Sequence, residues 1–125
     1  MVIELNIADD AVAFVFENAI RQVDVNEVKR RILDKLSERK NVSLYLEEDD
    51  VDEIKLRAFF DQVFFDIKHS DRIDKVAIVT DRTWIQTLSR IKDRLISSDV
   101  RVYDLKERVD AVCWIMSPTQ LMKGF

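Results

Sequence analysis

The sequence predicts a single α/β domain built on a mostly parallel sheet. Residues 76–79 form a continuous apolar run rich in β-branched side chains, which is typical of a strand buried on both faces. The run ends at Thr80, and an amphipathic helical pattern follows at once, with apolar residues at Trp84, Ile85, Leu88, Ile91 and Leu95. A buried strand that leads straight into a helix is half of a βαβ unit, so at least part of the sheet is parallel.

The first elements of the chain predict a hairpin followed by a helix. Residues 2–7 alternate in polarity, residues 11–16 are continuously apolar, and a short polar turn joins the two predicted strands. Asp24 and Glu27 have the spacing of a capping box, so we expect a helix to begin at Asp24. Its buried stripe is expected to consist of Val25, Val28, Ile32, Leu33 and Leu36.

The remaining elements alternate between strand and helix. We expect strands at 42–46, 73–80 and 99–103, and helices at 50–68, 84–96 and 104–115. The first and last of these helices start with Asp-x-x-Glu capping patterns at Asp50 and Asp104, and the last carries apolar residues at Val109, Val112, Cys113 and Ile115. Trp114 is interpreted as a packing anchor. The order ββαβαβαβα indicates an α/β domain over residues 1–116, followed by a tail at 117–125.

Composition and charge exclude several classes of protein. Of the 125 residues, 47% are hydrophobic and 35% are charged, which is typical of a folded globular domain. No apolar run approaches the roughly 20 residues that span a bilayer, and the N-terminus lacks a secretory signal pattern. A lone Cys113 cannot form an internal disulfide, so we expect a cytoplasmic location.

The net charge of −4 argues against nucleic-acid binding, because that affinity depends on clustered Lys and Arg. The charge is nevertheless uneven: residues 47–53 carry six acids, and residues 29–40 carry six bases against two acids. We favour a solvated helix face and an acidic loop with a helix cap. A local field that attracts a binding partner is the alternative.

A series of segments stands out in order along the chain: Lys68-His69, residues 71–81, Trp84, residues 100–103 and residues 110–115. Together these segments resemble the SpoIIAA-like family, a branch of the STAS and CRAL-TRIO-related α/β domains. This resemblance implies a five-stranded, mostly parallel sheet whose first strand is antiparallel. It also implies a small non-enzymatic module that binds lipophilic or anionic ligands, protein partners or membrane surfaces.

In the related anti-sigma-factor antagonists, a phosphorylatable Ser begins the helix after the third strand. Residues 47–50 of this chain are all acidic at that place, and no Ser or Thr follows before Ser70. The resemblance therefore implies a domain without the phosphorylation switch.

The predicted second helix has an unusually wide apolar surface. Its core stripe consists of Leu56, Phe60, Val63, Phe64 and Ile67, and Phe59 and Phe65 lie outside that stripe. Coverage by the sheet and a neighbouring helix is the favoured interpretation. A pocket between this helix, the helix that contains Trp84 and the sheet edge is the second, and a dimer or membrane-facing patch is the third.

The candidates for chemistry are few. His69 is the only histidine, so a two-histidine metal site is excluded, and we interpret it first as a cap of its helix's C-terminus and next as a ligand contact. Asp81 is expected to cap the following helix. Trp84 lies at the start of that helix, beyond the carboxyl end of a strand, where ligands prefer to bind. A core or lid role for Trp84 is favoured, and a ligand-facing role is the alternative. The chain has no phosphate loop, dinucleotide fingerprint or nucleophile elbow. We expect no enzyme activity, cofactor or metal.

The sequence therefore predicts a non-catalytic binding module for a small lipophilic or amphipathic ligand. Its ligand-binding residues are expected to be Phe59, Phe60, Val63, Phe64, His69, Asp81, Trp84 and Leu88. The alternative is a protein-interaction or self-association domain, such as a homodimer, that takes no small ligand. Basic residues beside the apolar stripe of helix 82–96 predict at most weak, peripheral membrane contact.

Overall fold

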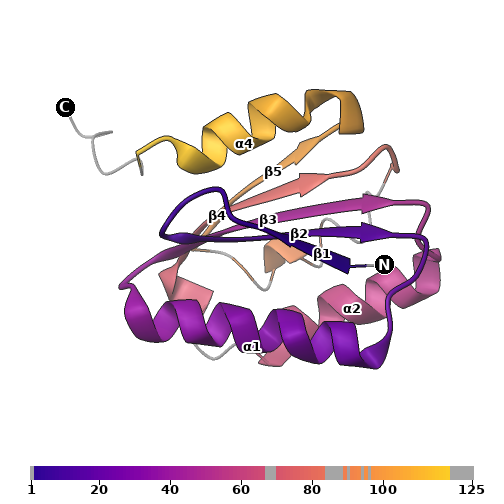
Figure 1. Ribbon diagram of the computed structural model, residues 1–125, viewed down its shortest axis with the longest axis horizontal. Helices are drawn as coiled ribbons and strands as arrows, with labels where there is room; N and C mark the ends of the chain where they lie inside the picture. Colours follow the sequence, from indigo (N-terminus) through magenta and orange to yellow (C-terminus); the bar gives the residue numbers. More distant parts are fainter. Residues whose placement is uncertain are drawn as a thin grey trace.

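A computed structural model describes residues 2–66, 70–83, 89, 91–93, 95 and 97–118. One five-stranded sheet has the order β1-β2-β3-β4-β5 (Figure 1). Only the first pair, β1 with β2, is antiparallel, and the other three pairs are parallel. The strands are β1 (Val2–Leu5), β2 (Ala11–Glu17), β3 (Val42–Asp49), β4 (Ile73–Val79) and β5 (Asp99–Tyr103). The predicted fold class and the antiparallel first strand are confirmed.

Helices cover both faces of the sheet, as the continuous apolar strands require. Figure 1 shows α1 (Gln22–Glu38) and α2 (Glu53–Asp66) on one face and α4 (Arg108–Met116) on the other. Short 3₁₀ turns precede β4 (Ser70–Arg72) and α4 (Leu105–Glu107). The predicted helix 84–96 falls largely outside the described residues, although residues 91–93 are helical.

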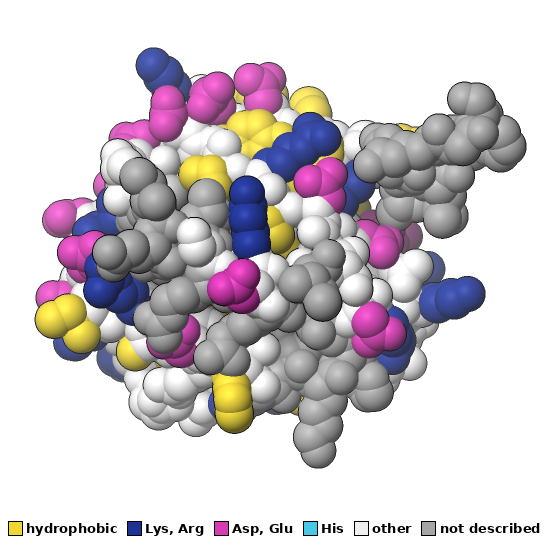
Figure 2. All heavy atoms as spheres, turned by 180° about the vertical axis from the view of Figure 1, so that it is seen from behind, with side chains coloured by type: hydrophobic (Ala, Val, Ile, Leu, Met, Phe, Trp, Pro, Cys, Tyr) yellow, Lys and Arg dark blue, Asp and Glu magenta, His cyan; other side chains and the backbone are white. Residues whose placement is uncertain are grey.

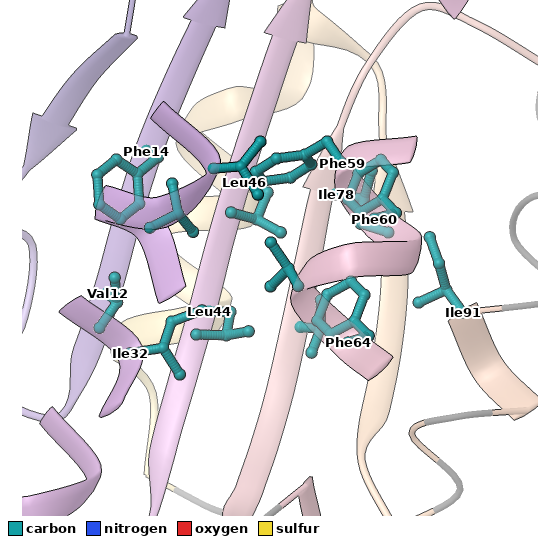
Figure 3. Packing of buried hydrophobic residues seen from close by; sticks show 14 of the residues in the cluster. Val12, Phe14, Ile32, Leu44, Leu46, Phe59, Phe60, Phe64, Ile78 and Ile91 are labelled. Carbon is teal, nitrogen blue, oxygen red and sulfur yellow. The ribbon is translucent and has the colours of Figure 1, made fainter. Parts of the chain in front are cut away.

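The larger core lies between the sheet and the pair α1 and α2, and it contains five of the seven phenylalanines (Figure 3). Strand alternation sends Phe14, Leu44, Leu46 and Ile78 to this face. The opposite face carries Ala11, Ala13 and Ala77 beneath α4, whose buried residues are Ala111, Trp114 and Ile115. Trp114 is thus the packing anchor that the sequence predicted.

Two helix starts differ from the predicted ones. The first helix begins at Gln22, and the Asp24 carboxylate accepts a 2.8 Å hydrogen bond from the Arg21 backbone N–H. Asp24 is therefore the third residue of α1 and not its N-cap. The Asp52 carboxylate caps α2 through the Lys55 N–H at 3.0 Å, whereas Asp50 lies two residues earlier in a left-handed conformation with φ 58°. In the last helix, Glu107 does reach back to the Asp104 N–H at 2.9 Å.

One predicted burial assignment was wrong. Leu33 is 47% exposed, because the buried stripe of α1 consists of Val25, Val28, Ile32 and Leu36 alone. Val109 is 69% exposed and Cys113 is also exposed, because α4 turns the opposite side toward the sheet. Phe59 lies outside the predicted stripe of the second helix but is buried in the core, as the favoured interpretation of a covered helix requires.

Candidate functional site

The carboxyl end of β3 carries two buried acids, which makes it the most unusual polar feature of the described structure. The sequence predicted that this strand would end at Leu46 and that an acidic loop would follow. Instead β3 continues to Asp49, with Glu47 only 6% and Glu48 only 4% exposed. Successive residues of a strand point to opposite faces, so one carboxylate lies on each side of the sheet.

Glu48 is the centre of a network on the side of α2. The Thr80 hydroxyl donates a 2.5 Å hydrogen bond to Glu48, and the Arg82 Nε atom lies 3.1 and 3.2 Å from its two carboxylate oxygens. Arg82 also donates through Nη2 to the backbone carbonyl of Val51, just before α2 begins. One arginine therefore joins the ends of β3 and β4 to the turn that leads into α2.

Glu47 has a matching arrangement on the side of α4. It accepts a 2.6 Å hydrogen bond from the Tyr45 hydroxyl and a 3.0 Å hydrogen bond from Arg108, the first residue of α4. Burial, followed by the hydrogen bond to Glu47, raises the pKa of Tyr45 well above its usual value of 10. The phenol is therefore a stable donor at physiological pH.

Lys75 lies on β4, is buried, and holds the end of α4. Its Nζ donates to the Trp114 carbonyl at 2.9 Å and to the Ser117 carbonyl and hydroxyl at 2.6 and 2.9 Å. A cation is favoured at the carbonyl end of a helix, so this contact is a C-terminal cap supplied by the sheet. Desolvation lowers the Lys75 pKa.

An open hollow of about 490 Å³ lies at the carboxyl edge of the parallel strands. Its lining is mainly acidic and consists of Asn18, Glu48, Asp49, Asp50, Asp81, Arg82 and Leu105. The predicted ligand residue Asp81 lines this hollow, where its carboxylate accepts a 3.0 Å hydrogen bond from the Leu105 N–H. This contact fixes the loop before α4, whereas the helix start that Asp81 was expected to cap lies outside the described residues.

The predicted aromatic residues are brought together in the main core. Phe59, Phe60, Val63 and Phe64 are all buried, and Figure 3 shows the three phenylalanines beside Leu46, Ile78 and Ile91. Phe59 contacts Phe16 edge to face at 4.7 Å, and Phe60 stacks on Phe64 at 5.9 Å. The favoured interpretation, a covered helix, is confirmed for these residues, whereas Phe65 is 71% exposed. Their contact with a ligand stays a prediction.

The other predicted ligand residues, His69, Trp84 and Leu88, lie outside the described residues, so their proximity to the aromatic core stays a prediction. In the described part of the chain, no cluster of three or more His, Cys, Asp or Glu side chains could hold a metal ion. No helix among the described residues is long and apolar enough to cross a membrane.

The basic segment 29–40 is partly neutralised within the structure. Arg30 pairs with Glu27 at 2.6 Å and with Asp34 at 2.8 Å, and Arg31 pairs with Glu4 on β1 at 2.9 Å. Figure 2 shows acidic and basic side chains interspersed over the described part of the molecule seen from behind. These pairs favour the solvated-face interpretation over a partner-binding field.

Comparison with known protein families decides the classification. A family model described as SpoIIAA-like matches residues 11–116, from the first residue of β2 to the last residue of α4. The chain belongs to the SpoIIAA-like family. No curated protein and no solved structure matches it. Membership in the SpoIIAA-like family indicates a STAS-type regulatory domain, in agreement with the fold.

Proposed function

We propose that this SpoIIAA-like domain is a non-catalytic cytoplasmic module that binds a small lipophilic or amphipathic molecule beside α2. The observation that carries the proposal is the aromatic layer beneath that helix. Phe16 of β2 and Phe59, Phe60 and Phe64 of α2 form a chain of ring contacts with centroids 4.7–5.9 Å apart.

The spacing of the layers supports this proposal. Within the described residues, the backbone of α1 approaches the backbones of β2 and β3. The backbone of α2 approaches that of α1 but no strand to the same extent. Large side chains rather than the α2 backbone therefore reach the sheet. A ligand that separates α2 from the sheet would expose phenylalanines at about 1.5–3 kcal/mol each, and an acyl chain in the gap would restore that burial.

The polar groups support a binding role without catalysis. Glu47 and Glu48 are the buried acids of the described structure, and each already accepts hydrogen bonds from a hydroxyl group and an arginine. A general base must be free to accept a proton from a substrate. We therefore assign these carboxylates to the architecture of the strand ends.

The two tryptophans of the chain offer a sharp test. A brominated fatty acid bound beside α2 is expected to quench Trp84, which the sequence predicts to lie near that site. It should leave Trp114 unquenched, because Trp114 lies beneath α4 on the opposite face. Quenching should therefore persist in Trp114→Phe and disappear in Trp84→Phe. Absence of quenching, together with a ligand-free mass for the protein purified from cells, would exclude the proposal.

A second candidate function is self-association through α4. Val109 is 69% and Met116 57% exposed, and with the exposed Cys113 they form an apolar stripe opposite the buried face of the helix. A second copy of the chain would cover this stripe. Light scattering should then give a dimer that Val109→Asp dissociates and Ile54→Asp, on the exposed side of α2, does not. A monomeric wild type would rule out this alternative.

A further inference from the structure

We propose that Arg82 is a latch that holds α2 in its closed position over the aromatic layer. Release of this latch would admit a ligand beside α2, and this consequence rests on the function proposed above. The latch consists of Arg82, the Glu48 carboxylate and the Val51 carbonyl.

The geometry gives each part of the latch a separate task. Glu48 is almost completely buried, and its two oxygens fix the Arg82 Nε atom at 3.1 and 3.2 Å. Thr80 contacts both members of this ion pair. Its hydroxyl donates a hydrogen bond to Glu48 and accepts one from the Arg82 backbone N–H at 3.1 Å. One of the two terminal amino groups of the guanidinium, Nη2, is thereby directed at the Val51 carbonyl.

The hydrogen bond to the Val51 carbonyl restrains the start of α2. Val51 is itself buried in the main core, and the chain enters the helix two residues later through its Asp52 cap. A second contact to α2, from the Gln22 amide to Gln62 at 3.0 Å, is exposed and uncharged. A hydrogen bond from an arginine is about twice as strong as a neutral one, so the latch is the stronger restraint.

The latch can also open without leaving a buried charge unpaired. Release of the Val51 carbonyl breaks one hydrogen bond, while Arg82 keeps its ion pair with Glu48. The alternative, separation of Glu48 from Arg82, would leave a buried carboxylate without its cation and is strongly disfavoured. The Arg82–Glu48 ion pair therefore stays intact when α2 opens, and the hydrogen bond from Arg82 to the Val51 carbonyl is the contact that breaks.

Hydrogen exchange of the full chain without ligand tests the latch. Arg82→Lys keeps a cation beside Glu48 but lacks the planar fork that reaches Val51 at the same time. We expect the amides of α2 to exchange about tenfold faster, or more, while those of α4 keep their wild-type rates. Arg108→Lys is the matched control, because Arg108 pairs with the buried Glu47 on the other face and should leave α2 unchanged.

The double variant Arg82→Met/Glu48→Gln removes both charges together and should loosen α2 in the same way. If it does not fold, Arg82→Lys alone decides. Unchanged exchange in α2, or equal acceleration in all elements, would overturn the latch. Quenching of tryptophan fluorescence by the brominated fatty acid, measured separately, distinguishes the latch from the proposed function. If α2 exchanges faster in Arg82→Lys but no fatty acid binds, only the proposed function is refuted. If the fatty acid binds but the exchange of α2 is unchanged in Arg82→Lys, only the latch is refuted.

Discussion

Replacement of Tyr45 by Phe tests the buried polar network on the α4 face. The change keeps the ring in the core and removes the hydroxyl that donates a 2.6 Å hydrogen bond to Glu47. Glu47 retains Arg108 at 3.0 Å, so its charge does not lose its cation. The predicted loss is therefore that of one charge-assisted hydrogen bond, about 1.5–3 kcal/mol of unfolding free energy.

The same variant has a distinctive dependence on pH. Because the Tyr45 pKa is raised in the folded protein, the folded state binds more protons than the unfolded state above pH 10. The contribution of this group is complete below pH 10 and falls as the pH rises above that value. Tyr45→Phe removes the titrating group, so the variant should lose less stability than the wild type between pH 9 and about 11.

Urea unfolding followed by circular dichroism gives both quantities. Tyr103→Phe is the control, because Tyr103 is the other tyrosine and lies only partly buried beside Trp114. A Tyr45→Phe variant that is as stable as the wild type at pH 7, or that loses as much stability as the wild type at alkaline pH, would contradict this role of the Tyr45 hydroxyl.

Three further outcomes follow from the described contacts and from the sequence. Lys75→Met removes the cation that donates to the Trp114 and Ser117 carbonyls, although the Ser117 hydroxyl still donates to Trp114. Urea unfolding should therefore show a loss of about 1–3 kcal/mol, and amide exchange should accelerate at the end of α4. Ile32→Ala should cost about 2–5 kcal/mol in the same assay and Leu33→Ala less than about 1, and equal losses would contradict the assigned face of α1. Liposome flotation should detect at most weak binding that requires anionic lipid and disappears at high salt, and equal recovery with neutral vesicles would contradict a peripheral membrane contact.

The fold could be predicted because its signals are local. Residues 11–16 and 76–79 are continuously apolar, which is typical of strands covered on both faces. They lie in β2 and β4, which each have a neighbouring strand on both sides. The predicted starts of the helices were less accurate, because a run such as residues 47–53 contains several acids that could act as the N-cap. Which of them does so depends on where β3 ends.

The end of β3 could not be predicted, because its burial depends on distant residues. The acidic run that contains Glu47 and Glu48 is typical of a loop. The partners that allow these two residues to be buried, Arg108 and Arg82, lie 61 and 34 positions away along the chain. The attachment of α4 did have a signal in the sequence: Lys75 lies in β4 directly before the apolar run 76–79, and a cation buried in a strand needs a partner. The identity of that partner, the end of α4, required the three-dimensional structure.

The two faces of the sheet differ in how their helices are attached, and this difference leads to a last prediction about the wild type. Three alanines allow α4 to pack closely on its face, and Lys75 and Arg108 fix its two ends to the sheet through charged groups. On the other face, α2 rests on phenylalanine side chains, and the latch holds its leading turn.

Packing on large side chains with few polar attachments favours local opening, whereas charged restraints at both ends oppose it. We therefore expect the amides of α2 to exchange faster than those of α4, although α4 has nine residues and α2 has fourteen. Helix length alone predicts the reverse order, because shorter helices fray more readily. Equal protection of the two helices, or stronger protection of α2, would show that attachment to the sheet does not control their opening.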